Sequence, residues 1–184
     1  MNSIPKKPVR YRHFTIEQYE AKSLARFWAK VNKTETCWLW TGRVTTNGYG
    51  THTLREYPEG RLKDGVKTRD VRAHRYSWDL ENGPMPEGME VDHVCHTRLC
   101  VRPTHLRIAT RKQNGENRKG ATALSTSGVR GVSWIAAKSR WRAVVGHNGK
   151  NVHVGYFLEL ADAEAAVIAK RNELFTHNDL DRLA

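Results

Sequence analysis

The stretch from Met89 to Arg118, MEVDHVCHTRLCVRPTHLRIATRKQNGENR, decides the fold of the central part of this chain. Residues 89–93 follow a Pro-Glu-Gly turn and read as a short strand, and residues 106–109 alternate like a second strand. Residues 110–113 form a capping box that opens a short helix ending near Arg118. Strand, loop, strand and helix in so short a segment do not fit a doubly wound unit. A bound metal is therefore a candidate for holding the segment together.

The cysteines do not form a disulfide framework. There are three of them in a chain whose N-terminus lacks a signal-peptide pattern, and an odd number without export argues against structural disulfides. Cys95 and Cys100 lie five residues apart among polar residues, and His105 follows five residues later. This spacing fits neither a core strand nor a helix face, so the segment reads as a metal-binding knuckle.

Asp92, His93 and Asn114 offer the groups that phosphodiester hydrolysis needs. The reaction requires a base to activate water and a cation to neutralise the scissile phosphate and the leaving oxygen. His93 is a base suited to neutral pH, and Asp92 and Asn114 offer hard oxygen ligands that suit Mg²⁺. Neighbouring strand residues point to opposite faces. We therefore expect the strand to end or kink at Asp92-His93, so that both side chains reach one site.

These residues resemble the His-Asn-His (HNH) nucleases with a ββα-metal fold, especially phage and intron-encoded homing endonucleases. The resemblance covers about residues 27–118 and includes Cys37-Trp38-Leu39-Trp40-Thr41-Gly42, Gly48-Tyr49-Gly50 and Ala73-His74-Arg75. It implies that His93 is the general base and that Asp92 and Asn114 hold a catalytic divalent metal, Mg²⁺ or Mn²⁺. It also suggests that Arg75 contacts the DNA backbone or the scissile phosphate, although a solvated arginine is an equal alternative.

The resemblance also implies a structural zinc, which is almost always four-coordinate. Cys95, Cys100 and His105 supply three ligands, and family members with this lead-in place a cysteine at the position of Cys37. His96 and His74 are the competing fourth ligands. One residue departs from the family pattern: Arg102 precedes Pro103 where an asparagine is common, which puts the rigidity of the loop in question.

The C-terminal part reads as a separate DNA-binding module. Three candidate strands (129–135, 140–146 and 151–156) precede a helix over 159–175, and Asn148-Gly149 is a hairpin turn signal. Ser127–Trp134, Arg140–Ala143 and Gly155–Phe157 resemble the APETALA-two/ethylene-response-factor DNA-binding domain. That resemblance implies a three-stranded antiparallel sheet lying in the major groove. The implied DNA-facing residues are Arg130, Trp134, Arg140, Trp141 and Arg142, with core packing as the alternative for one of the two tryptophans.

The predicted fold class is α+β: a zinc-stabilised ββα-metal HNH nuclease domain, followed by a three-stranded antiparallel sheet packed on one helix. The expected nuclease domain, with its N-terminal helix, covers residues 1–118. A linker of small residues covers 119–127, and the DNA-binding domain covers 128–184. Because the linker is small and polar, we expect the two domains to be separable. Residues 56–70 read as a polar surface loop.

The net charge of +12 favours a polyanionic partner, and we expect double-stranded DNA. No apolar run is long enough for a membrane span, and we expect a cytoplasmic protein of a bacterium or a phage-infected cell. The leading interpretation is a sequence-directed, metal-dependent endonuclease. The alternative is a non-catalytic zinc-containing DNA-binding regulator, and an RNA-binding module is weaker still. The sequence leaves open whether the protein forms a homodimer, nicks one strand or cuts both.

Overall fold

The computed structural model describes residues 16–56 and 67–183. Contacts divide the chain into two compact units. One comprises the residues up to Ser77 together with 99–102, and the other comprises residues 78–98 and 103–184. Each unit is described by itself below. In the described part of the chain, no helix is long and apolar enough to cross a membrane.

The first unit joins helices and two hairpins around an aromatic core. Its elements are α1 (Ile16–Trp28), β1 (Val31–Lys33), β2 (Trp38–Trp40), β3 (Thr51–Glu56), β4 (Lys67–Arg72) and the start of α2 (Ala73–Asn82). β1 pairs antiparallel with β2, and β3 pairs antiparallel with β4. Phe27 and Trp40 lie fully inside this core with Ala73 and Val101. A Cβ on Gly50 would lie 2.4 Å from Trp40 Cδ1, so only glycine fits there.

The strand β4 differs from the sequence expectation. Residues 56–70 were expected to form a loop, and 57–66 lie outside the described residues. Lys67–Arg72 instead pairs along its whole length with β3, from Glu56 opposite Lys67 to Thr51 opposite Arg72. Its sequence, KTRDVR, lacks apolar alternation. It is held by pairing and by Asp70, which accepts hydrogen bonds from Thr53 at 2.7 Å and from Arg43.

The second unit begins with a ββα arrangement. β5 (Met89–His93) pairs antiparallel with β6 (Leu106–Thr110), and α3 (Arg111–Glu116) follows at once; a 3₁₀ turn, η2 (Pro103–His105), precedes β6. The predicted capping box is present, because the Thr110 side chain accepts from Gln113 N and the Gln113 side chain accepts from Thr110 N. The strands and the helix lie where the sequence predicted them.

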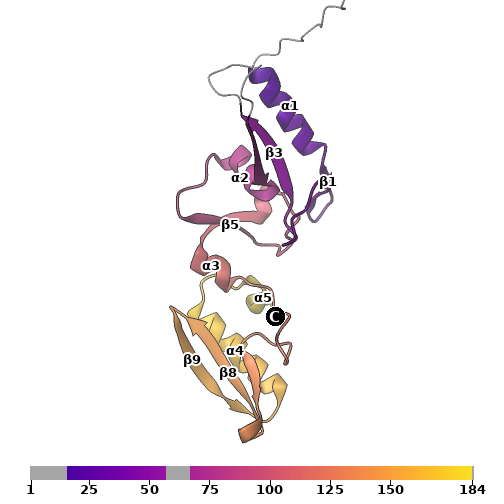
Figure 1. The fold of residues 1–184 in the computed structure, drawn as a ribbon. Coiled ribbons are helices and arrows are strands. Elements are labelled where there is room, and N and C mark those ends of the chain that lie inside the picture. The colour runs from indigo at the N-terminus through magenta and orange to yellow at the C-terminus, as the bar shows by residue number, and fades with distance from the viewer. Residues whose placement is uncertain (1–15, 57–66, 184) are drawn as a thin grey trace, which may run out of the picture. The chain divides into compact units, whose positions relative to one another are not determined.

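The rest of the second unit is a three-stranded sheet with a helix against one face (Figure 1). The elements are β7 (Val132–Ile135), η3 (Ala136–Lys138), β8 (Arg140–His147), β9 (Lys150–Phe157), α4 (Leu160–Leu174) and α5 (Asp179–Leu183). The strand order is β7-β8-β9, all antiparallel. Asn148 and Gly149 both have positive φ, as the predicted hairpin turn requires. Ala143, Val145, Ala163 and Val167 are central to the core between sheet and helix.

The ββα segment and the C-terminal sheet belong to one compact unit. Their contact is polar and specific: Thr176 donates to the buried Glu116 carboxylate from its backbone N at 3.0 Å and from its hydroxyl at 3.3 Å. α3 is therefore packed against the C-terminal part of the chain.

Candidate active site and metal centre

Asp92 lies near the end of β5 and is held from the neighbouring strand. It is directly opposite Arg107 in the antiparallel register, so both side chains leave the same face of the sheet. Arg107 Nε and Nη2 donate to Asp92 Oδ2 at 3.1 and 3.0 Å. Asp92 is 6% exposed, and a carboxylate buried to that degree requires such partners.

Two asparagines, one in α3 and one directly after it, reach the same face of β5. Asn117, at the end of the helix, donates to Asp92 Oδ2 at 2.8 Å and to the His93 carbonyl at 3.3 Å. Asn114 donates to Glu90 Oε2 at 2.5 Å. Glu90 and Asp92 are two residues apart on the strand and share a face, as Asn114 and Asn117 do one helical turn apart. Asn117 was not among the sequence-predicted site residues.

The side chains of Asp92 and Asn114 each offer an oxygen that could bind a hard divalent cation. All hydrogen bonds that Asp92 accepts from the described residues fall on Oδ2, which leaves Oδ1 without one. Asn114 uses its Nδ2, and its Oδ1 accepts none from the described residues. A carboxylate oxygen and an amide oxygen, each oriented through the other atom of the group, are the donors that Mg²⁺ and Mn²⁺ take.

β5 ends at His93, as expected from the sequence. The chain turns directly after it, and His96 N donates to the His93 carbonyl at 3.2 Å. Pairing continues without a register shift through His93, which lies opposite Leu106, so no kink separates Asp92 from His93. The two side chains therefore leave opposite faces at the end of one strand.

Arg107 connects this site to α5. Its Nη2 donates to Asp179 Oδ2 at 2.6 Å and its Nη1 to Asp179 Oδ1 at 3.3 Å. Burial disfavours the charged guanidinium, but hydrogen bonds and charges from Asp179 and Asp92 outweigh it and raise the pKa of Arg107. Arg107 was not predicted from the sequence. The sequence signal for Arg107 was its place between the apolar residues Leu106 and Ile108 in a predicted strand.

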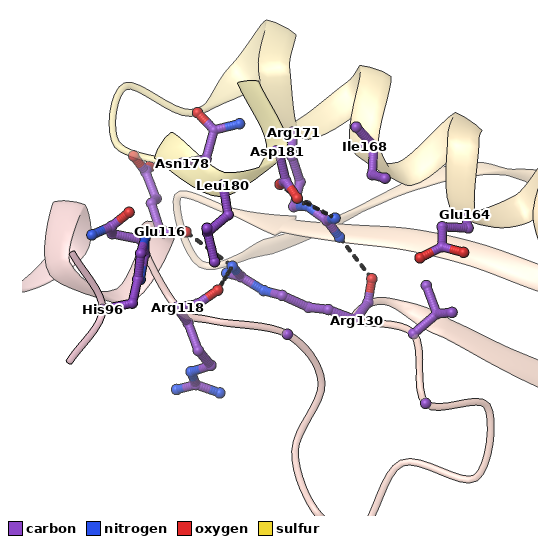
Figure 2. A pocket seen from close by; sticks show the side chains of 14 residues that line it. His96, Glu116, Arg118, Arg130, Glu164, Ile168, Arg171, Asn178, Leu180 and Asp181 are labelled. Atoms are coloured by element: carbon purple, nitrogen blue, oxygen red, sulfur yellow. Dashed lines mark hydrogen bonds and ion pairs between the residues drawn. The ribbon is translucent and has the colours of Figure 1, made fainter. Parts of the chain in front are cut away.

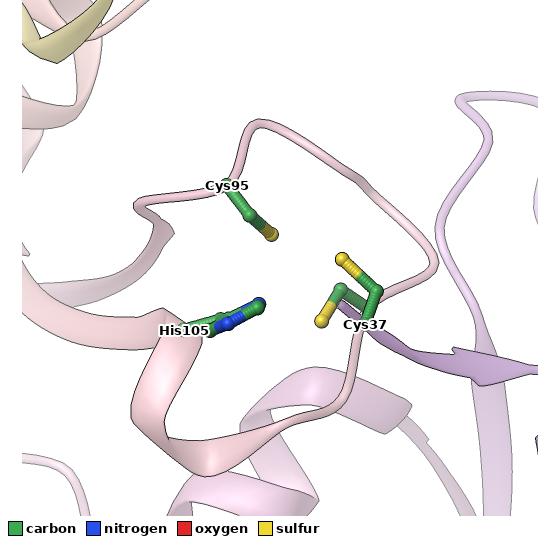
Figure 3. Close-up of side chains that lie close together, drawn as sticks. Cys37, Cys95 and His105 are labelled. Atoms are coloured by element: carbon green, nitrogen blue, oxygen red, sulfur yellow. The ribbon is translucent and has the colours of Figure 1, made fainter. Parts of the chain in front are cut away.

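The three cysteines and one histidine gather as a possible metal site. One ligand atom from each of Cys37, Cys95, Cys100 and His105 lies within 4.8 Å of all the others, and Figure 3 shows the side chains converging. Ligands at zinc-bond length in a tetrahedron are roughly 3.8 Å apart, so the cluster could bind zinc. The competing ligands, His96 and His74, are not in the cluster.

Arg102, the residue that departs from the family pattern, makes defined contacts. Its Nη1 donates to the carbonyls of Glu35 and Thr36, both at 3.0 Å. The preceding residue, Val101, donates from its backbone N to Trp38 O at 2.8 Å. Arg102 therefore contacts the segment immediately before Cys37.

Arg130, which the resemblance implies to face DNA, contacts the end of α3. Its guanidinium donates to the carbonyls of Glu116 at 2.9 Å, Gly115 at 3.1 Å and Arg118 at 3.2 Å. Burial, with the nearby charges of Arg171 and Arg118, lowers the pKa of Arg130. These carbonyls lie at or just after the C-terminal end of α3, so Arg130 caps that helix.

The Arg130 contacts border a polar pocket of about 120 Å³ (Figure 2). The backbone carbonyl of Arg130 accepts from Arg171 Nη1 at 2.7 Å, and Arg171 also forms an ion pair with Asp181 at 2.6 Å. Arg171 and Asp181 are thus paired with each other. Figure 2 shows labelled side chains from the end of α3, the segment before β7, α4 and α5 around this pocket. The pocket is a structural junction within the second unit.

The other predicted DNA-facing residues divide between the two faces of the sheet. Trp134 lies opposite Trp141, with ring centroids 5.0 Å apart, and Trp141 packs against the core beneath α4. Trp134 is 45% exposed but leaves the same face as Trp141. Arg140 and Arg142 leave the opposite face. Arg75, on α2, is exposed.

The face of Arg142 is hollowed. Arg142, Val144, Asn151, His153 and Tyr156 line a groove of about 400 Å³. Lys138 lies with its Nζ 4.0 Å from the centroid of the Tyr156 ring. We call this side of the sheet, defined by Arg140 with the five groove residues, the outer sheet face.

Comparison with known proteins identifies the central segment. Residues 71–116 match the family described as HNH endonuclease, and they contain β5, β6 and α3. The chain is 34% identical over 103 residues to "Protein 3.8" of Escherichia phage T7, covering 56% of this chain and 84% of that protein. The chain belongs to the same family as this phage protein.

Other phage proteins share part of the chain. It is 35% identical over 83 residues to "Protein 7.7" of phage T7, covering 45% of this chain and 55% of that protein. It is 33% identical over 58 residues to the "Uncharacterized gene 5.3 protein" of Enterobacteria phage T3, covering 32% and 56%. No solved structure gives a significant match. The HNH domain suggests DNA endonuclease activity, and HNH domains are metal-dependent.

Proposed function

We propose that this chain is a sequence-directed DNA endonuclease of the homing type, with His93 as general base and Asp92 and Asn114 as ligands of a divalent metal. The observation that carries the proposal is that Asp92 and His93 are adjacent at the end of β5, and that Asn117, directly after α3, donates a hydrogen bond to Asp92. A regulator that only binds DNA has no need of this arrangement.

The strand end suits in-line attack on a phosphodiester. The attacking and leaving oxygens lie on opposite sides of the phosphorus. β5 ends at His93, so a phosphate bound beyond the strand end would lie within reach of both His93 and Asp92. The metal, when bound, neutralises the phosphate and the leaving oxygen. His93 takes the proton of the attacking water, and its backbone carbonyl is fixed by Asn117.

The outer sheet face supports DNA reading by the C-terminal part. Arg140 and Arg142 leave this face, and the charge of the whole chain is +12. A sheet of this width fits the major groove, where an arginine pairs with guanine edges or with phosphates. We assign this face, rather than Arg130 or the Trp134–Trp141 pair, to base contact, as the resemblance to APETALA-two domains suggests in outline.

A structural zinc at the four-residue cluster completes the proposal. The cluster has the Cys₃His composition of closed structural zinc sites. The catalytic metal would be Mg²⁺ or Mn²⁺, because its proposed ligands are oxygens. The two metals therefore use different donor atoms and should be separable by selective chelation.

Incubation of supercoiled plasmid with the purified chain tests the proposal. We expect open circles, or linear molecules if both strands are cut, with Mg²⁺ and none without an added divalent metal. Asp92→Asn should bind the same DNA without cutting it. Retarded but uncut plasmid with every divalent metal tried would instead support the zinc-containing regulator.

A further inference from the structure

Arg107 lies between two carboxylates from distant parts of the chain. It contacts Asp92 of β5 at 3.0 Å and Asp179 of α5 at 2.6 Å through the same Nη2 atom. Asp92 is almost fully buried, whereas Arg107 and Asp179 are about one-quarter exposed. Asp179 is 87 positions from Asp92 in the sequence numbering, so only the fold brings them together.

A guanidinium beside a metal ligand opposes metal binding. Asp92 and Arg107 alone carry no net charge, and a divalent cation near them gains little electrostatic energy. Asp179 adds a second carboxylate to the same guanidinium, so the three groups together carry one negative charge. The guanidinium is also shared between two acceptors, and Asp92 keeps Oδ1 without a hydrogen bond from the described residues.

Asp179 reaches the site by a second route. Its backbone N donates to Asn117 Oδ1 at 3.3 Å, and Asn117 Nδ2 donates to Asp92 Oδ2 at 2.8 Å. Both side chains that orient Asp92 therefore contact the first residue of α5. The Asp179 carboxylate contributes the charge, and its backbone contributes to the orientation of Asn117.

We propose that Asp179 is a positioning residue for the catalytic metal site: it balances the charge of Arg107 so that Asp92 can bind a divalent cation. This inference rests on the proposed function, since it assigns Asp92 to that cation. It makes the C-terminal α5 part of the nuclease site rather than a tail of the DNA-binding sheet.

The test compares Asp179→Asn with the wild-type chain, both with zinc retained. Titration calorimetry with Mn²⁺, in the absence of DNA, should show an affinity about tenfold weaker in the variant, as expected for loss of one nearby charge. Asp179→Glu, which keeps the charge, should bind within about threefold of the wild type. Glu173→Gln is the matched control, because it removes the same charge from an exposed pair with Lys170, and its Mn²⁺ affinity should not change.

Two further measurements separate this role from folding. DNA binding without added Mg²⁺ or Mn²⁺ should be unchanged in Asp179→Asn, and the Mg²⁺ concentration for half-maximal nicking should rise by the same factor as the Mn²⁺ dissociation constant. Asp179→Ser provides a second neutral variant if the asparagine variant fails to fold. Unchanged Mn²⁺ affinity in a folded neutral variant would overturn the role of Asp179 but not the proposed function. A wild-type chain that neither binds Mn²⁺ nor nicks DNA would overturn the proposed function as well.

Discussion

Arg130 donates a hydrogen bond to the carbonyl oxygen of Glu116 at 2.9 Å, which joins the start of the C-terminal sheet to the end of α3. Two more carbonyls at that helix end accept from the same guanidinium. Arg130, to which the family resemblance assigns DNA contact, is thus a helix cap. The helix that it caps carries both Asn114 and, one residue beyond its end, Asn117.

Arg130→Ala should destabilise the second unit. The variant leaves three carbonyls without their charged donor, and we expect a loss of about 2–3 kcal/mol in the free energy of unfolding. Urea unfolding followed by circular dichroism measures it. Arg142→Ala is the control, because Arg142 is exposed on the outer sheet face; it should leave stability unchanged and weaken DNA binding. Weaker DNA binding with unchanged stability in Arg130→Ala would instead support contact between Arg130 and DNA.

A chain ending at Arg118 should lose nuclease activity rather than only specificity. Truncation there removes Arg130, Thr176 and Asp179, each of which contacts α3, its end or Arg107. Hydrogen exchange of the α3 amides should become much faster in the truncated chain than in the full one. Protected α3 amides together with retained cleavage would show that the two predicted domains are separable after all.

Purified protein should contain about one zinc per chain. Cys100→Ser should lose that zinc and lower the midpoint of thermal unfolding, because structural zinc contributes directly to folding. His96→Ala is the matched control: His96 lies within the same knuckle but outside the Cys₃His cluster, so its zinc content should stay the same. Metal analysis that finds zinc lost from His96→Ala and kept in Cys100→Ser would reverse the ligand assignment.

His52 should make the first unit sensitive to acid. Burial, with the charges of Lys30 and Arg26, lowers the pKa of His52 from 6.5 to about 4. The side chain is 3% exposed, and neither ring nitrogen has a hydrogen-bond partner among the described residues. The unfolded chain binds a proton at His52 at a higher pH than the folded chain does. The contribution of neutral His52 to the free energy of unfolding is therefore complete above pH 6.5 and decreases as the pH falls towards 4.

The size of this effect is up to about 3 kcal/mol at pH 4. Unfolding measured at pH 7.5 and pH 5 should show lower stability at pH 5. His52→Phe, which keeps an aromatic ring beside Phe27 and Tyr76, should reduce that difference, whereas His153→Gln at an exposed position should not. Identical pH dependence in His52→Phe and wild type would remove His52 as the cause.

Local signals in the sequence located the elements around the site. The capping box at Thr110, the hairpin turn at Asn148-Gly149 and the alternation in 106–109 depend on neighbouring residues, and the structure confirms each. β4 was missed because its charged residues carry no apolar period; only its pairing with β3 makes it a strand.

Contacts between distant residues were beyond local reasoning. The role of Arg107 depends on Asp179, which is 72 positions away in the sequence. The role of Arg130 depends on Glu116, which is 14 positions away. The sequence around Arg107 predicted an alternating strand, and the family resemblance implied that Arg130 faces DNA. The Cys₃His cluster was predictable because its residue types are rare and its chemistry requires four ligands.

The rate of plasmid nicking by His93→Ala, at saturating Mg²⁺ and with protein in excess over DNA, tests the central claim most directly. Loss of a general base should lower this rate by about 10²–10⁴-fold, while DNA binding measured without added divalent metal stays at the wild-type level. Nicking by His93→Ala at the wild-type rate would contradict the assignment of His93 and with it the proposed nuclease site.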